Sequence, residues 1–350
     1  MSGISDVARL AGVSKSTASR ALSGSGYVSE KTRLKVAAVA ASLEYVPSSN
    51  AASLVTGRTR NVGVVIPYLH RWFFAEVLEG IQAALLERGL DLTLYDANPG
   101  TEGRRRIFED FLARKRFDGL IAVGLEPEDH ELERLLKIGR PVVSVVGTDA
   151  DASVIGIDDN DAARRATHHL TSLGHEHIAF VGGGSSPRWA SVDRRRLDGY
   201  LEAMSEAGLT ARAQHIRSEV SLPGGYAAAV DLLGARSRPT GIVAVCDEVA
   251  IGAIIAARRL GIGVPGDLSV VGIDDHKYAE MFALTTLQQV PREQGRAAVE
   301  LLEAQLADAD AEPTHLALSA RLIVRASTGP VDAQHSVMVS DARTGIDGSV

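Results

Sequence analysis

The chain has 350 residues, of which 45% are hydrophobic and 23% are charged, so it is long enough for two or three folded domains and is not disordered as a whole. Its single cysteine, Cys246, excludes an intrachain disulfide framework and a zinc site made of several cysteines. The sequence has neither the start of a signal peptide nor the roughly 18 uninterrupted apolar residues of a membrane span, which predicts a cytoplasmic protein without a membrane partner.

The net charge of −7 is unevenly distributed along the chain. Residues 1–60 carry eight basic and three acidic side chains, a balance of +5, which leaves −12 for residues 61–350. A basic N-terminal segment on an acidic body is typical of a small nucleic-acid-binding module joined to a larger domain.

Residues 1–46 are predicted to form three short helices, at 5–11, 15–22 and 30–43. Gly12 supplies a stop for the first helix, and Ser14 and Ser29 are suited to cap the second and third. The apolar side chains expected in the core of this unit are Val7, Leu10, Ala11, Ala18, Ala21, Leu22, Leu34, Val36, Val39 and Leu43. Two helices joined by a tight turn and followed by a third predict an all-α helix-turn-helix domain.

The outer face of the second helix carries small polar and basic side chains, namely Lys15, Ser16, Thr17, Ser19 and Arg20. Arginine and lysine can donate to guanine edges in the major groove, and serine or threonine can contact bases or phosphates. A polar outer face is also what any solvated helix shows. The pattern by itself therefore leaves DNA binding and ordinary surface as alternatives.

From Asn61 onward, segments typical of strands and helices alternate. The predicted strands are 62–67, 92–95, 119–123, 141–146, 178–181, 216–220, 242–245 and 268–273, and the predicted helices are 73–88, 104–115, 131–138, 195–207, 226–233 and 249–260. Repeated strand-helix units indicate parallel sheets with helices on both faces, and two such series predict an α/β core of two Rossmann-like lobes. Ligands of such sheets bind beyond the carboxyl ends of the strands, which places a site between the lobes.

Three N-terminal segments, ISDVARLAGVSKSTASRALS at 4–23, VSEKTR at 28–33 and YVP at 45–47, together resemble the start of the LacI/GalR (lactose-repressor) family. The resemblance implies that the second helix enters the major groove of a palindromic operator. The DNA-contacting residues that it implies in this domain are Ser14, Lys15, Ser16, Thr17, Arg20 and Tyr27, with Lys15, Ser16 and Arg20 as the base readers.

The same resemblance implies that residues 47–60 form a hinge helix that orders on DNA, contacts it through Asn50 and inserts Leu54 into the minor groove. One position departs from the family. The family usually has an arginine two residues before this leucine, whereas this chain has Ala52. The preference of the family for a central base step is therefore not carried over.

Five segments of the core also resemble the family, whose core is similar to periplasmic sugar-binding proteins: NVGVVIP at 61–67, FFAEVLEGI at 73–81, LGHEHIAFVGG at 173–183, VVGIDD at 270–275 and LTTLQQ at 284–289. The resemblance implies crossings between the lobes near Asp161, Val290 and Ala320. The N-lobe would then comprise about 61–161 and 291–320, and the C-lobe about 162–289 and 321–330. Residues 331–350 are rich in small polar residues, which predicts a disordered tail.

By the same matching, the residues expected to bind an effector are Phe73, Asp158, Arg196, Asp247, Asp274 and Gln289. Some of these carboxylates can instead cap helices or turns. Cys246 stands where the family usually has asparagine, and Val220 where many sugar-binding members have an aromatic ring. Trp72 and Trp189 lie near the predicted pocket loops and can stack on a ligand instead. A sugar is the leading effector class, and a nucleoside or another small polar metabolite remains open.

Several motifs resemble catalytic, cofactor or metal sites. The G-x-G-x-x-G at 261–266 follows a helix and precedes a strand, the reverse of the dinucleotide-binding order. The glycines at 182–184 lack the lysine of a phosphate loop, and the histidines at 168, 169, 175 and 177 lack a partner ligand of another type. No nucleophile motif is present. We therefore expect no cofactor, no metal and no enzymatic activity.

The sequence thus predicts a homodimeric transcriptional repressor whose affinity for double-stranded operator DNA is controlled by a small effector. Whether the effector induces or co-represses is not encoded in any motif. One alternative is a solute-binding protein of a transport system, which would need a signal peptide and no helix-turn-helix. The other is a sugar-modifying enzyme fused to a DNA-binding head, which a turnover assay would reveal.

Overall fold

The computed structural model describes residues 3–24, 26–45, 57–147, 152–184, 190–308 and 311–331. Several predicted features lie outside the described residues. These are the hinge contacts of Asn50 and Leu54, the departure at Ala52, the stacking residue Trp189 and the tail from 332 to 350.

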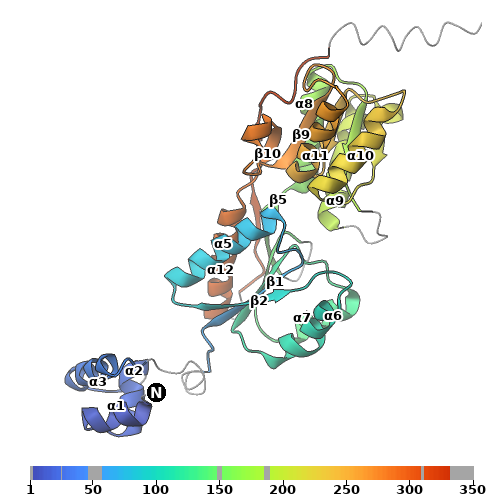
Figure 1. The fold of residues 1–350 in the computed structure, drawn as a ribbon. Coiled ribbons are helices and arrows are strands. Elements are labelled where there is room, and N and C mark those ends of the chain that lie inside the picture. The colour runs from blue at the N-terminus through green and yellow to red at the C-terminus, as the bar shows by residue number, and fades with distance from the viewer. Residues whose placement is uncertain are drawn as a thin grey trace, which may run out of the picture.

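The N-terminal unit consists of α1 (Ile4–Ala11), α2 (Lys15–Ser23) and α3 (Glu30–Ser42) (Figure 1). Gly12 ends α1 with a φ of 67°, in the left-handed region that glycine adopts without a Cβ clash. The Ser14 side chain accepts a hydrogen bond from the Thr17 backbone N–H, and Ser29 accepts one from Thr32. The predicted helix-turn-helix and its two serine caps are confirmed.

The core of this unit is made mainly of small side chains. The buried residues are Val7, Ala8, Ala11, Ala18, Ala21, Val36 and Ala40, which let the three helices approach closely. The prediction was wrong for Leu10 and Leu34, which are 50% and 64% exposed. Leu34 lies two positions before the buried Val36, and residues two apart on a helix face nearly opposite directions.

Two six-stranded sheets form the core of the chain. The first has the order β11-β5-β4-β3-β1-β2 and the second the order β12-β10-β9-β8-β6-β7, and every pair is parallel except β10 with β12. The strands are β1 (Asn61–Ile66), β2 (Asp91–Asp96), β3 (Gly119–Val123), β4 (Val142–Val145), β5 (Ser153–Ile157), β6 (Ile178–Val181), β7 (Gln214–Ile216), β8 (Gly241–Ala244), β9 (Ser269–Asp274), β10 (Thr285–Gln288), β11 (His315–Leu318) and β12 (Arg321–Ile323). The predicted two-lobed α/β core is confirmed.

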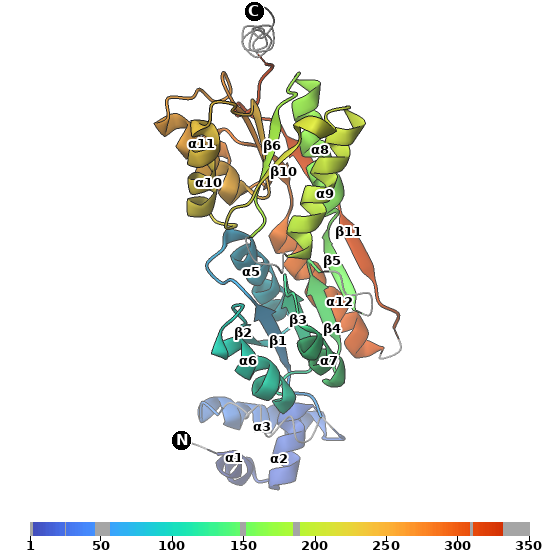
Figure 2. The ribbon, with the colours of Figure 1, turned by 90° about the vertical axis from the view of Figure 1, so that its right-hand side faces the viewer.

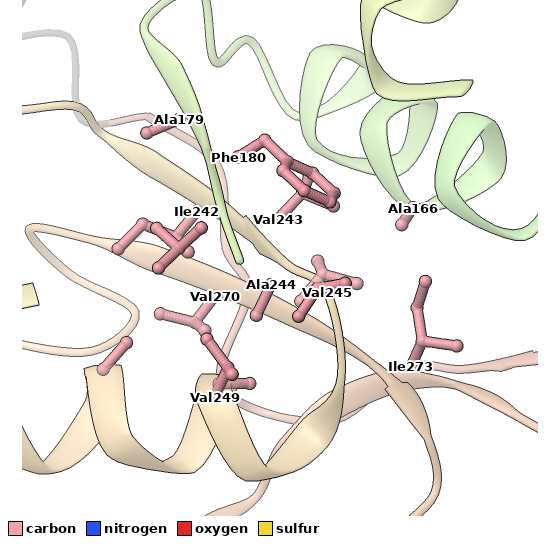
Figure 3. Packing of buried hydrophobic residues seen from close by; sticks show 14 of the residues in the cluster. Ala166, Ala179, Phe180, Ile242, Val243, Ala244, Val245, Val249, Val270 and Ile273 are labelled. Carbon is pink, nitrogen blue, oxygen red and sulfur yellow. The ribbon is translucent and has the colours of Figure 1, made fainter. Parts of the chain in front are cut away.

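Helices cover both faces of each sheet (Figure 2). In the first lobe, α5 (Trp72–Glu87) and α12 (Pro291–Ala307) pack on one face, and α6 (Glu102–Arg106) and α7 (Asp129–Lys137) lie on the other. In the second lobe, α8 (Asp159–Ser172) and α9 (Ser191–Glu206) form one layer, and α10 (Leu222–Gly234) and α11 (Asp247–Arg259) form the other. Figure 3 shows the side chains of β6, β8 and β9 packed between α8 and α11.

Some predicted elements differ in extent from the observed ones. The helix predicted at 104–115 is broken into α6, a π-helical turn at Ile107–Phe111 and a 3-10 turn at Leu112–Arg114. The strand predicted at 216–220 ends at Ile216, because the following residues lead into Ser221, the N-cap of α10. The chain leaves the first sheet after β5, returns to the first lobe with α12, and pairs β11 and β12 with different sheets.

A buried histidine fixes the C-terminal segment to the second sheet. His175 is 3% exposed, its Nδ1 lies 3.0 Å from Thr240 Oγ1, and its Nε2 lies 2.9 Å from Ser269 Oγ and 3.0 Å from the Gly329 carbonyl oxygen. Burial lowers the pKa of His175 because the protonated ring would bring a charge into the core.

This geometry predicts how stability depends on pH. Because the folded state binds the His175 proton less readily than the unfolded chain, the free energy of unfolding should fall as pH drops below about 6.5. Urea unfolding at pH 7.5 and 5.5 should show that His175→Gln reduces this pH dependence and costs about 1–3 kcal/mol at pH 7.5. His130→Gln, at an exposed histidine, is the control and should keep the wild-type pH dependence. Equal pH dependence in wild type and His175→Gln would contradict the assignment.

Candidate DNA-binding face and interlobe site

The outer face of α2 is exposed and positively charged. Ser14, Lys15, Ser16 and Arg20 are exposed and Thr17 is half-buried. Lys15 and Arg20 form no ion pair with any other described residue, and α2 has no acidic residue in its first turn. Their charges are therefore available to phosphates or base edges.

Two further features border this face. The Tyr27 side chain is 95% exposed, which is unusual for an aromatic ring in a folded unit. Gly26 has a φ of 73°, and a Cβ at this position would lie 3.3 Å from Arg20 Cδ. Gly26 therefore lies close to the stem of Arg20, one residue before the exposed Tyr27. Ser14 also caps α2, so its hydroxyl is already hydrogen-bonded to Thr17.

In the second lobe the structure brings three predicted effector residues together. Arg196 of α9 is buried, and its Nη1 donates to the Val245 carbonyl oxygen (2.6 Å) and lies 3.8 Å from Asp274 Oδ1. Asp274, at the end of β9, accepts a hydrogen bond from Gln289 Nε2 (2.6 Å). The Nε of Arg196 donates to Asp159 Oδ1 at 2.9 Å. The cluster joins the carboxyl ends of two neighbouring strands, where such sheets bind ligands.

The backbone at this edge is held in an uncommon conformation. Asp274 has a φ of 135° and Asp275 a φ of 58°, both unusual for residues other than glycine. Asp275 is fixed by Gln288 Nε2 (2.6 Å) and Arg325 Nη2 (2.8 Å). Burial raises the pKa of Asp274, and Arg196 opposes that shift. Strained residues of this kind concentrate at binding sites, where the surrounding structure holds them in place.

Asp158 caps a helix, and Asp247 is hydrogen-bonded inside the second lobe. Asp158 is exposed and caps α8 by accepting the Asp161 N–H at 3.0 Å. Asp247 is fully buried and accepts hydrogen bonds from the His276 N–H and the Thr286 hydroxyl, each at 2.7 Å. Burial and the neighbouring Asp274 raise the pKa of Asp247. Both oxygens of Asp247 are therefore bound within the protein, whereas Asp158 uses one oxygen, Oδ1, as a helix cap.

The two lobes contact each other through several side chains, of which only Trp72 was singled out from the sequence as a ligand contact. Arg71, immediately before α5, places its Nε 3.2 Å from Glu248 Oε2 and its Nη2 3.9 Å from Cys246 Sγ. The rings of Trp72 and His276 are 4.8 Å apart. Glu126 Oε1 accepts hydrogen bonds from Ser191 N (2.9 Å) and Ser191 Oγ (2.6 Å). These contacts place the N-terminus of α5 directly against the second lobe.

Unused hydrogen-bonding groups lie at the same place. Asp193 is half-buried and forms no hydrogen bond or ion pair with another described residue. Burial raises the pKa of Asp193, while the charges of Arg196 and of Arg71 in the other lobe lower it. The indole Nε1 of Trp72 is buried and also has no partner in the described part of the chain. Phe73, in the first turn of α5, is half-buried and packs edge-on against Phe74.

Other candidate chemistry is not supported by the geometry. His168 contacts Glu206 and His169 contacts Thr328, so the four neighbouring histidines do not converge, and no group of three metal-ligating side chains is found among the described residues. Burial raises the pKa of Cys246 to about 12, which keeps its sulfur a thiol. A cavity of about 610 Å³ lies beside α7, and no predicted site residue lines it. No helix in the described ranges is long and apolar enough to cross a membrane.

Comparison with known proteins identifies the family of the chain. Residues 3–48 match the bacterial regulatory proteins of the lacI family, and residues 167–328 match the periplasmic binding protein-like domain. The chain is 32% identical over 333 residues to the HTH-type transcriptional repressor PurR of Photobacterium profundum, covering 93% of this chain and 98% of that protein. The chain belongs to the LacI family. It is therefore a DNA-binding transcriptional regulator and not an enzyme, as predicted.

Two solved structures extend the comparison of this LacI-family regulator. The lac repressor dimer bound to operator and the anti-inducer ONPF matches with a TM-score of 0.83 and 27% identity, covering 94% of this chain and 99% of that chain. A LacI family transcriptional regulator from Enterococcus faecium with bound ribose matches with a TM-score of 0.70 and 27% identity, covering 78% and 100%.

The contact between Arg71 and Glu248 can be tested by a double-mutant cycle. Both side chains are about one-fifth exposed, so we expect a coupling free energy of about 0.5–1.5 kcal/mol between Arg71→Gln and Glu248→Gln, measured by urea unfolding. The exposed pair Glu102 and Arg105 within α6 is the matched control and should show no measurable coupling. Additive effects of the Arg71 and Glu248 substitutions would show that the pair does not hold the lobes together.

Proposed function

We propose that this regulator is a cytoplasmic, homodimeric repressor that binds a palindromic operator and responds to a small polar effector between its lobes. The observation that carries the proposal is the pairing of two features in one chain. One is the basic face of α2, whose Lys15 and Arg20 form no ion pair with another described residue. The other is the cluster of Arg196, Asp274 and Gln289 beside Asp193, which has no partner among the described residues.

On the DNA side, the exposed side chains of α2 suit the major groove. Arg20 and Lys15 supply donors for guanine edges, and Ser16 and Thr17 can serve bases or phosphates. One such helix reads only one half-site, so a palindrome requires two copies held at a fixed spacing. The lac repressor structure that matches this chain is a dimer bound to operator, which supports this arrangement.

The second lobe also carries exposed apolar side chains. Leu222 precedes the body of α10, and Tyr278 and Met281 lie in the loop after β9; they are 38%, 47% and 78% exposed. In a homodimer, a second copy that covers these side chains would remove them from water. A second copy of the chain is the partner that two half-sites require.

On the effector side, the groups that face the interlobe site are hydrogen-bonding rather than purely apolar. Asp193 offers an acceptor, Trp72 Nε1 a donor, and Trp72 and Phe73 offer ring surfaces. A polyol presents both donors and acceptors and therefore matches this set. The ribose bound in the Enterococcus faecium regulator supports a sugar, and a nucleoside or related metabolite fits the same groups.

The DNA-reading role of α2 is tested by Arg20→Ala. Operator duplexes are first selected from a random DNA library with the wild-type protein, and affinity is then measured by fluorescence anisotropy. Loss of one base-reading arginine should weaken binding at least tenfold, because such contacts contribute about 1–3 kcal/mol. Arg33→Ala removes an exposed charge from α3 instead and should have a smaller effect. Unchanged affinity in Arg20→Ala would refute the role of Arg20.

The effector site is tested by Asp274→Asn. Sugars, sugar phosphates and nucleosides are screened by thermal shift, since a ligand that binds the folded state raises its melting temperature. We expect Asp274→Asn to abolish the shift caused by the best compound while operator affinity without that compound stays within a few-fold of wild type. Asp267→Asn, in a loop of the second lobe, is the control and should keep the shift. A normal shift in Asp274→Asn would exclude Asp274 from the effector site.

A further inference from the structure

The segment that enters the first lobe from the DNA-binding unit is bound by one carboxylate. Asp118 Oδ1 accepts hydrogen bonds from Thr59 N (2.7 Å) and Thr59 Oγ1 (3.0 Å), and Oδ2 accepts one from Arg60 N (2.8 Å). Asp118 is 6% exposed, and its own N–H donates to the Asn61 carbonyl oxygen. The carboxylate is therefore fixed at the start of β3 with both oxygens directed to the incoming chain.

Two other elements bind the same short segment. Arg60 Nη2 donates to the Gly89 carbonyl oxygen (3.0 Å) in the turn after α5, and Arg58 Nη2 donates to the Leu306 carbonyl oxygen (3.3 Å) in the last turn of α12. We name Asp118, Gly89 and Leu306 the linker clamp, because together they hold residues 58–60. The clamp joins β3, α5 and α12 to the chain that leads to the DNA-binding unit.

The clamp holds a backbone conformation that the chain would not adopt by itself. Arg60 has a φ of 54°, in the left-handed region, which is disfavoured for a residue with a Cβ. The Arg60 N–H donates to Asp118, and its carbonyl oxygen accepts the Asp91 N–H (2.9 Å). Without the carboxylate, residue 60 would relax toward ordinary φ values, and the chain would leave the lobe in another direction.

Two helices of the first lobe run from the interlobe site to the clamp. α5 starts at Trp72, which contacts His276 of the other lobe, and ends two residues before Gly89. α12 starts two residues after Gln289 and contains Leu306 in its last turn. With 16 and 17 residues, these helices are roughly 24–26 Å long, so each spans the lobe.

The two helices are packed closely enough to move together. A Cβ on Gly80 would come within 2.1 Å of the Arg292 carbonyl oxygen, and a Cβ on Gly295 within 2.3 Å of the Val77 carbonyl oxygen. The backbones are thus in direct contact, and Arg296 of α12 also pairs with Glu87 at the end of α5 (2.8 Å). Close-packed elements transmit displacement rather than absorb it.

We propose that Asp118 is a positioning residue for operator binding. Its carboxylate sets the direction in which residues 58–60 leave the first lobe. It also couples that direction to any displacement of α5 and α12 that begins at the interlobe site. This inference rests on the proposed function, because it assumes an operator and an effector. Loss of the carboxylate should weaken operator binding and uncouple it from the effector without removing the effector site, which lies at the other end of both helices.

The test is Asp118→Asn in the full-length protein. The amide keeps the shape of the carboxylate but turns one acceptor into a donor, which then faces the N–H of Thr59 or Arg60. We expect operator affinity to fall about tenfold and the effector-dependent change in that affinity to shrink by a similar factor. The thermal shift caused by the compound from the screen should be unchanged. Asp267→Asn replaces a carboxylate that accepts the Gly263 N–H at 2.7 Å, far from the linker, and should behave as wild type.

Hydrogen exchange gives a readout that needs neither operator nor effector. The amides of Thr59 and Arg60 should exchange at least tenfold faster in Asp118→Asn, while amides of β1 and β3 keep their protection. Thr59→Val removes the hydroxyl, which donates to Asp118 and accepts the Asn61 N–H (3.3 Å), but keeps both backbone bonds to the carboxylate. It should cause a smaller, roughly two- to fivefold loss of operator affinity, so it tests the clamp even if Asp118→Asn folds poorly.

Two results would overturn the inference. Unchanged exchange at residues 59 and 60 in Asp118→Asn would show that the carboxylate does not hold the linker. Faster exchange with unchanged operator affinity and effector response would show that the clamp has no part in regulation. A wild-type protein that selects no DNA and binds no compound would instead refute the proposed function, and the exchange result would still report on the clamp.

Discussion

The guanidinium of Arg196 is the interaction on which the interlobe site depends. It is 6% exposed and bonded to Asp159 at the start of α8 and to the Val245 carbonyl oxygen after β8, with Asp274 of β9 nearby. A charge buried without partners would cost several kcal/mol, so these groups must stay together once the lobe has folded. One side chain of α9 thereby fixes the carboxyl edge of the sheet and the strained backbone at Asp274, and the rest of the site is built on that edge.

Local sequence signals predicted the elements whose cause is local. Ser14 and Ser29 cap helices through bonds to residues three positions away, and the apolar runs of β1 and β8 are buried as the pattern indicates. Apolar periodicity did not reveal α8, because this helix is rich in charged residues and alanine. Its buried side consists mainly of alanines, which give only a weak apolar signal. The predicted burial of Leu34 was wrong for a similar reason, because alanines rather than leucines fill much of the N-terminal core.

The sequence could not predict the pairs that form across long separations. Arg71 and Glu248 are 177 positions apart, and Thr59 and Asp118 are 59 apart, so no motif links their members. The resemblance to a known family did place Arg196, Asp274 and Gln289 near one another, because it supplied the topology that brings strand ends together. It could not show that Asp247 is enclosed by hydrogen bonds within its own lobe, or that Asp193 is left without a partner among the described residues.

The interlobe contacts also bear on how strongly an effector must bind to act. They include one partly exposed ion pair, Arg71 with Glu248, and one ring contact, Trp72 with His276, each of which contributes about 0.5–1.5 kcal/mol. With contacts this weak, little free energy opposes a change in the arrangement of the lobes, as the proposed function requires. A ligand shifts such an equilibrium only by its difference in affinity for the two states, and about 1–3 kcal/mol of difference changes operator occupancy by up to roughly a hundredfold. Because α5 begins at these contacts, the switch of the lobes and the displacement of α5 toward the linker that we propose would both begin at the same contacts.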